Sequence, residues 1–180
     1  MADEKNTFLM ALYGKEELQI KFVEWWKSLK EDPGARARLR RCASPEEAAL
    51  LSETYQVMRI IPWCSGECAA TIAGIVSHIE EGENEKISLA VKLAKPKKKN
   101  DRVPFSESRF RHLLSCKTWN EFYTDLRRAV QILGRTVNPL SVIDVIIAWD
   151  NELKRKQSEA IRKSIKFELS RQYYTQLMES

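Results

Sequence analysis

Residues 119–149 read WNEFYTDLRRAVQILGRTVNPLSVIDVIIAW and contain two consecutive helix patterns. In the first pattern, large apolar residues recur at three- and four-residue steps and so share one side of a helix: Trp119, Phe122, Leu126, Val130 and Leu133. Gly134 is expected to cap this helix, and Pro139 to open the next one. The valines and isoleucines after Pro139 point all round the axis, which predicts a helix at the centre of the core.

The rest of the chain shows similar helical periodicity. Further helices are expected at about 15–30, in a short arginine-rich segment ending near 41, and at about 44–61, 67–80, 87–94, 106–116 and 158–178. No segment alternates convincingly with a period of two, so the predicted fold is all-α, a bundle of about eight helices. We expect the bundle to consist of two helical lobes, residues 1–100 and 101–180, which meet at a basic loop near residue 100 and form one compact unit.

Composition narrows the class of protein. The chain has 180 residues, of which 43% are hydrophobic and 31% charged, enough for one globular domain with a sizeable core. It contains no apolar run of membrane-spanning length, and its acidic N-terminus does not resemble a signal peptide, so we expect a cytoplasmic protein without membrane contact. Four cysteines are expected as buried free thiols. Cys64 and Cys68 lack a second Cys/His pair at zinc-finger spacing.

The sequence offers no catalytic constellation. Of the two histidines, His78 lies on an apolar helix pattern and is expected in or near the core, whereas His112 is expected on the solvent side of its helix. No nucleophile elbow, phosphate-binding glycine loop or His-Glu-x-x-His motif occurs. We therefore expect a protein that is not an enzyme and that uses neither a cofactor nor a metal.

Basic residues are unevenly distributed. The net charge is +5, yet residues 95–128 alone hold 10 basic and 4 acidic residues. In the short helix that follows Asp32, a stripe of Ala35, Leu39 and Cys42 is expected to dock, with Arg36, Arg40 and Arg41 pointing away and Arg38 on the flank. The same arrangement also fits a solvated basic face without a partner.

Further basic side chains could share a surface with this helix: Arg109, Arg111, Arg127, Arg128 and Lys154. Because a guanidinium group donates two parallel hydrogen bonds to phosphate, such a surface suits a nucleic-acid backbone. No base-reading module is recognisable, so binding is expected to be independent of nucleotide sequence.

Several motifs occur in an order typical of one known family. They are Trp25-Trp26-x-x-Leu29, Arg38-Leu-Arg-Arg41, Ile87-Ser-Leu-x-x-x-Leu-Ala94, Ser106-Glu-x-Arg109-Phe-x-x-Leu-Leu114, Leu126-Arg-Arg128, and Leu140 leading to Trp149. With them the chain resembles CasB, the small subunit of the type I-E CRISPR surveillance complex Cascade, over nearly its whole length. The Lys95–Asn100 insertion and the extended last helix depart from the family pattern.

The resemblance implies a non-catalytic helical subunit that is present as two head-to-tail copies among the other Cascade subunits. In the family, this subunit borders the hybrid of guide RNA and target DNA and helps to hold the displaced strand, which stabilises the R-loop. The positions here that match the family's basic residues are Arg40, Arg41, Arg109, Arg127 and Arg128, with Lys92 and Lys154 as looser matches.

Two other functions remain open from the sequence. The chain could be a general RNA-associated helical protein, or a helical scaffold whose basic surface binds an acidic protein. Competition by free nucleic acid separates the scaffold from the nucleic-acid-binding alternatives, and copurification with a guide-RNA ribonucleoprotein separates a Cascade subunit from both.

Overall fold

A computed structural model describes residues 15–82, 87–96, 101–154 and 164–179, and these residues form an all-α fold. The prediction of an all-α bundle is confirmed. Within the described ranges the helices are α1 (Glu16–Glu31), α2 (Pro33–Arg41), α3 (Pro45–Ala48), α4 (Ser52–Ile60), α5 (Gly66–Val76), α6 (Leu89–Ala94), α7 (Glu107–Ser115), α8 (Trp119–Ile132), α9 (Pro139–Lys154) and α10 (Ile165–Glu179).

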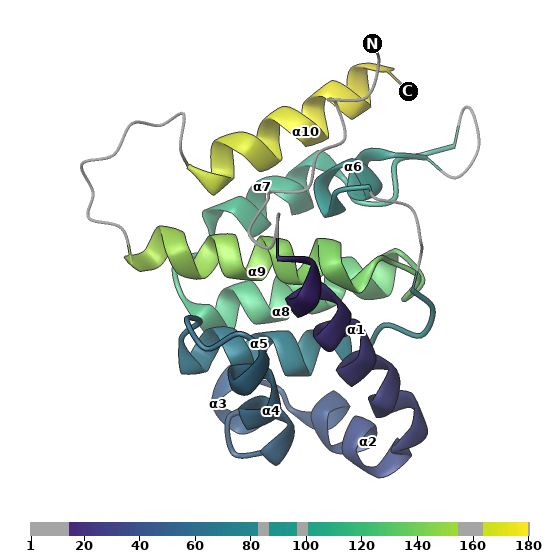
Figure 1. Cartoon of the computed structure of the whole chain (residues 1–180). Helices are drawn as coiled ribbons and strands as arrows, with labels where there is room; N and C mark the ends of the chain where they lie inside the picture. Colours follow the sequence, from purple (N-terminus) through teal and green to yellow (C-terminus); the bar gives the residue numbers. More distant parts are fainter. Residues whose placement is uncertain (1–14, 83–86, 97–100, 155–163, 180) are drawn as a thin grey trace.

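The helices are stacked around α9 and α5. Figure 1 shows α10 crossing above α6 and α7, with α9 beneath them and α8 and α5 lower still. The short helices α2, α3 and α4 lie at the base, and α1 runs along one side. Most residues of α9 are buried, as its all-round apolar pattern predicts, and its Trp149 stacks on Phe122 of α8 with ring centroids 4.4 Å apart.

Helix α5 packs closely against its neighbours because its side chains are small. Every residue from Cys68 to Val76 is buried, and α5 contacts α2, α3, α4, α8 and α9. A Cβ atom added at Gly74 would lie 2.3 Å from the hydroxyl oxygen of Tyr123 on α8. The approach of α8 to α5 therefore requires glycine at this position.

The end of α8 is tied to the segment after α5. Gly134 and Arg135 both have positive φ, 75° and 61°, and this left-handed turn ends the helix as the predicted glycine cap requires. The carbonyl of Arg135 accepts a 2.9 Å hydrogen bond from the amide of Glu80. An isolated bridge between Glu81 and Thr136 follows directly. The C-terminal ends of α5 and α8 thus lie together.

Two expected helix boundaries are wrong. The helix expected from residue 44 to 61 is two helices, α3 and α4, because the backbone is extended at Leu51. The carbonyl of Ala48, at the end of α3, accepts a hydrogen bond from the hydroxyl of Thr54. The helix expected from residue 67 to 80 ends at Val76. The first part of the expected last helix, residues 158–163, lies outside the described residues, as do residues 97–100 of the Lys95–Asn100 insertion.

Other expectations about single residues are confirmed. Cys42, Cys64, Cys68 and Cys116 are buried free thiols. His78 is buried, and the His112 side chain is 70% exposed.

None of the described helices is both long enough and apolar enough to cross a lipid bilayer.

Candidate nucleic-acid interface

Helix α2 positions the arginines of residues 36–41. The Asp32 side chain caps it by accepting a 2.9 Å hydrogen bond from the amide of Ala35, and Pro33 occupies its first position. Ala35 and Leu39 are buried, which confirms the expected docking stripe. Beside this stripe Arg36 and Arg40 are half-buried, whereas Arg38 and Arg41 are exposed.

Arg36 and Arg40 do not simply extend into solvent. The Arg36 side chain donates to the carbonyls of Ser77, at 3.0 Å, and Ile79, at 2.7 Å, and Arg40 donates to Ser77 at 2.8 Å. These carbonyls follow α5, where the helix dipole is negative and the last carbonyl groups lack helical partners. The two arginines thus cap the C-terminal end of α5, and a solvated face is the wrong interpretation for both side chains.

The carbonyl of Cys42 joins the end of α2 to α8. It accepts hydrogen bonds of 3.2 Å from Nη1 of Arg127 and from the hydroxyl of Tyr123. The Arg127 guanidinium also lies over the Tyr123 ring, 5.9 Å from its centroid. Through this junction the fold places Arg127 at the end of α2, although Cys42 and Arg127 lie 85 positions apart in the sequence.

Arg135 completes a group of four that we call the arginine cluster: Arg36, Arg40, Arg127 and Arg135. Oε1 of Glu80 pairs with Arg135 at 2.8 Å and with Arg40 at 3.4 Å, so one carboxylate joins α2 to the turn after α8. All four guanidinium charges act on His78. Burial, followed by the positive charges of the cluster with Arg127 first, lowers the pKa of His78 to about 4.

Three further arginines of the predicted interface are exposed: Arg41, Arg128 and Arg109. Arg41 is exposed at the end of α2, and its side chain makes no hydrogen bond or ion pair with any described residue. The Arg128 side chain is 67% exposed and pairs with Asp125 at the long distance of 3.5 Å. Arg109 on α7 is exposed and likewise unpaired within the described ranges.

The other residues expected in the interface have local partners or lie elsewhere. Arg38 pairs with the buried carboxylate of Glu53 at 2.7 Å, and Arg111 pairs with Glu107 one turn earlier on α7. Lys92 is half-buried on α6, which packs against α10 and α9.

Lys154 lies at the opposite end of α5 from the arginine cluster. It bonds to Asp150 at 2.6 Å, and Asp150 also accepts hydrogen bonds from the amide and hydroxyl of Ser65 at the start of α5. Because α5 has 11 residues, about 16 Å of helix separates the two ends. The structure therefore brings Arg127 to the end of α2, where Arg40 and Arg41 lie, places Arg128 beside Asp125 on the side of α8 that faces α7, and leaves Lys154 apart.

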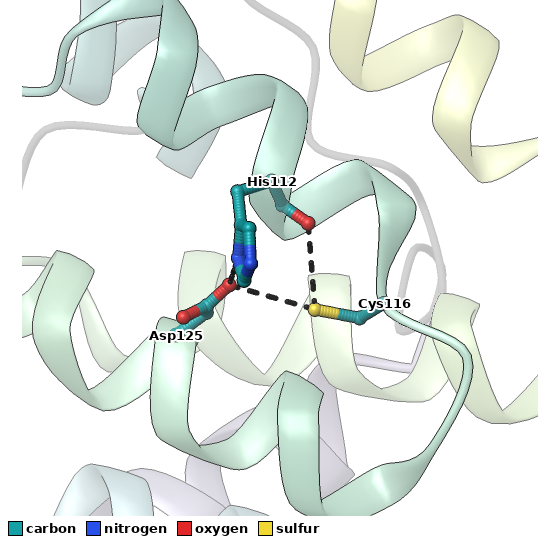
Figure 2. Close-up of side chains that lie close together, drawn as sticks. All are labelled: His112, Cys116 and Asp125. Atoms are coloured by element: carbon teal, nitrogen blue, oxygen red, sulfur yellow. Dashed lines mark hydrogen bonds and ion pairs between the residues drawn. The ribbon is translucent and has the colours of Figure 1, made fainter.

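A second feature lies where α7 meets α8, next to Arg128. Figure 2 shows His112 and Cys116 from one helix end pointing toward Asp125 of α8. Oδ2 of Asp125 contacts Nδ1 of His112 and lies 3.6 Å from Sγ of Cys116. Burial and the Asp125 carboxylate raise the pKa of the Cys116 thiol to about 12. Arg109 lies one helical turn before His112 and therefore shares its side of α7.

Sequence reasoning missed Arg135 and the trio of His112, Cys116 and Asp125. Arg135 stands alone after a glycine cap, and nothing in its neighbourhood marks it as part of a cluster. The spacing of His112 and Cys116 puts both on one side of a helix, which is a usable signal, but their partner comes from the next helix.

A protein-family model described as CRISPR-associated protein Cse2 matches residues 35–174 of this chain. The chain belongs to the Cse2 family. The match runs from within α2 into α10 and includes all members of the arginine cluster as well as Arg41, Arg109 and Arg128. No curated protein and no solved structure matches the chain.

Membership of the Cse2 family confirms the resemblance to CasB, the small subunit of type I-E Cascade. The Cse2 family consists of subunits of CRISPR Cascade complexes, so the family assignment makes this chain a Cascade subunit and implies other Cascade subunits as its partners.

Proposed function

We propose that this chain is a non-catalytic Cascade subunit that contacts nucleic-acid backbone and stabilises both the hybrid of guide RNA with target DNA and the displaced strand. In this role two copies stack head to tail within the complex, and guide RNA and DNA are direct partners. The observations that carry the proposal are the Arg127 guanidinium held at the end of α2, where Arg41 is exposed, and the exposed Arg128 that follows Arg127 on α8.

These arginines have donors left for phosphate. A guanidinium group carries five N–H donors. Arg41 uses none of them within the described ranges, and Arg127 uses only Nη1, for the carbonyl of Cys42. Arg127 is also held in place by that bond and by the Tyr123 ring, so less side-chain entropy is lost when it contacts a phosphate.

The local charge balance favours an anion. Around His78 the arginine cluster contributes four positive charges, and Glu80 is the acid paired with two of its members. Arg41 adds a fifth charge from the end of α2. A surface with this excess attracts a polyanion and binds it with a strong dependence on salt, because each neutralised phosphate releases counterions.

Contacts of this kind suit R-loop stabilisation. The exchange of a DNA duplex for an RNA–DNA hybrid is nearly balanced in free energy, so modest contacts with the backbone are enough to shift it. Base pairing supplies the sequence specificity, and the protein needs only phosphate contacts, which carry no sequence information. An arginine surface without a base-reading module meets this requirement.

The test is retention of target DNA by the reconstituted complex across a series of salt concentrations. The variant combines Arg41→Ala with Arg128→Ala, which removes two exposed cations, one at the end of α2 and one next to Arg127 on α8. The matched control combines Lys27→Ala with Arg59→Ala, because these exposed cations lie on α1 and α4 and not on the two helices of the proposed interface. Thermal unfolding of the isolated chains checks that both double variants keep the fold.

We expect the Arg41/Arg128 variant to retain target DNA less well, with a log–log salt slope shallower by about 2, as the loss of two phosphate contacts requires. The control should behave like the unmodified chain. Equal retention and equal slope for the unmodified chain and the Arg41/Arg128 variant would refute the proposal. Capture of an acidic protein that free nucleic acid does not displace would favour the scaffold function.

A further inference from the structure

We propose that His112, Cys116 and Asp125 form a binding site for a divalent metal ion of the zinc type, between α7 and α8. The three residues offer an imidazole nitrogen, a sulfur and a carboxylate oxygen, and these atoms all lie within 4.8 Å of one another. Figure 2 shows the three side chains converging from the two helices.

The spacing of the donor atoms fits a shared ion. Zinc lies about 2.0 to 2.3 Å from nitrogen, oxygen and sulfur ligands, and so a tetrahedral site holds its ligand atoms about 3.3 to 3.7 Å apart. Sγ of Cys116 and Oδ2 of Asp125 are already 3.6 Å apart. Nδ1 of His112 contacts the same carboxylate oxygen and has to withdraw to admit the ion between them.

The exposure of the three side chains allows this adjustment. Cys116 is 4% exposed and Asp125 is 7% exposed, so the packing of α7 on α8 fixes both. The His112 side chain is 70% exposed and can turn without disturbing the core. Its open side also leaves a fourth position that faces solvent, which a water molecule would fill.

The chemistry of the donors selects the ion. Magnesium and calcium prefer oxygen ligands, whereas a sulfur with an imidazole favours zinc and related transition metals. The Cys116 thiol gives up its proton to water as the metal–sulfur bond forms. The resulting thiolate and the Asp125 carboxylate together neutralise the two charges of the ion.

The surroundings support coordination through one oxygen of Asp125. Arg128 lies 3.5 Å from Oδ1, whereas Oδ2 faces both His112 and Cys116. A ligating carboxylate whose other oxygen has a polar partner is the usual arrangement at metal sites, because the partner fixes its orientation. An ion here would join α7 to α8 directly.

The experiment titrates the full-length chain with Co²⁺ and with Zn²⁺ after treatment with a chelator. With Co²⁺ we expect a thiolate-to-cobalt charge-transfer band, and with Zn²⁺ a rise in melting temperature. His112→Gln should weaken binding roughly tenfold or more, since loss of even an outer partner of a metal ligand costs 10- to 100-fold. Cys116→Ser should abolish the charge-transfer band.

Two controls separate this site from other donors in the chain. Cys64→Ser retains the trio and removes one thiol of the Cys64–Cys68 pair, and His78→Gln removes the other histidine. Both controls should bind cobalt like the unmodified chain. The proposal is overturned if no ion is taken up from a moderate excess, or if binding survives unchanged in both His112→Gln and Cys116→Ser. Because His112 is exposed, His112→Gln tests the site even if Cys116→Ser fails to fold.

Discussion

His78 makes the stability of this chain depend on pH. It is 6% exposed, and burial together with the charges of Arg127, Arg40, Arg135 and Arg36 lowers its pKa to about 4. The unfolded chain exposes the same histidine, whose pKa returns to about 6.5. Between these two values the unfolded state binds the proton and the folded state does not. The contribution of His78 to the stability of the folded chain is therefore complete above about pH 6.5 and is lost as the pH falls toward 4.

The size of the effect follows from the two pKa values. Between pH 7 and pH 5 the proton bound by the unfolded chain should lower the free energy of unfolding by about 2 kcal/mol, or about 1 kcal/mol if solvent screens the arginine charges. Carboxylates contribute to acid destabilisation as well, but mostly at lower pH. A variant without the titrating group separates the two contributions.

The assay is urea unfolding at pH 7 and pH 5, followed by tryptophan fluorescence, for the unmodified chain and for His78→Gln. We expect the unmodified chain to lose about 1 to 2 kcal/mol more than the variant on acidification. His112 remains in both proteins and cancels in the comparison. An equal loss in the two proteins would show that His78 titrates normally in the folded chain and would refute the description of its surroundings.

Two further predictions concern the packing and capping of α5. Gly74→Ala places a Cβ 2.3 Å from the Tyr123 hydroxyl oxygen and 2.7 Å from its ring, so overpacking should lower the free energy of unfolding by about 2 to 3 kcal/mol, measured by urea unfolding. Arg36→Ala removes two hydrogen bonds to the carbonyls after α5 and should cost about 1 to 3 kcal/mol. Arg36→Lys should be destabilised as well, because an ammonium group lacks the planar fork that reaches the carbonyls of both Ser77 and Ile79. A lysine variant as stable as the unmodified chain would argue against the capping role.

The helices themselves follow from local sequence. The steps of Phe122, Leu126 and Val130 predict α8, and the apolar residues on all sides of α9 predict its place in the core. These properties depend on neighbouring residues along one helix, and so a single sequence reveals them. The end of α5 at Val76 is different, because it depends on Arg36 and Arg40 from a segment about 40 residues earlier.

The candidate interface was predictable only in part. The phosphate-binding chemistry of arginine, and the exposure of Arg41 and Arg128, follow from residue type and helical position. Arg40 has its capping role because it bonds to the carbonyl of Ser77, and Arg135 belongs to the cluster because it pairs with Glu80. Only the folded chain shows these two contacts. The same holds for Lys154, which the loose family match grouped with the arginines and which the structure places at the far end of α5.

The central claim is that the surface around Arg127 and Arg128 lies against nucleic acid in the assembled complex. Gln131 is exposed one turn after Arg127 on α8, and Asn151 is exposed one turn before Lys154, which lies at the other end of α5. A photo-crosslinking amino acid can replace either residue without removing a positive charge. Irradiation of the complex bound to target DNA then reports what each position touches.

We expect crosslinks from position 131 to RNA or DNA in clear excess over those from position 151. Crosslinks from position 131 to protein alone, or equal nucleic-acid crosslinking from the two positions, would contradict the claim that this surface contacts the nucleic-acid backbone.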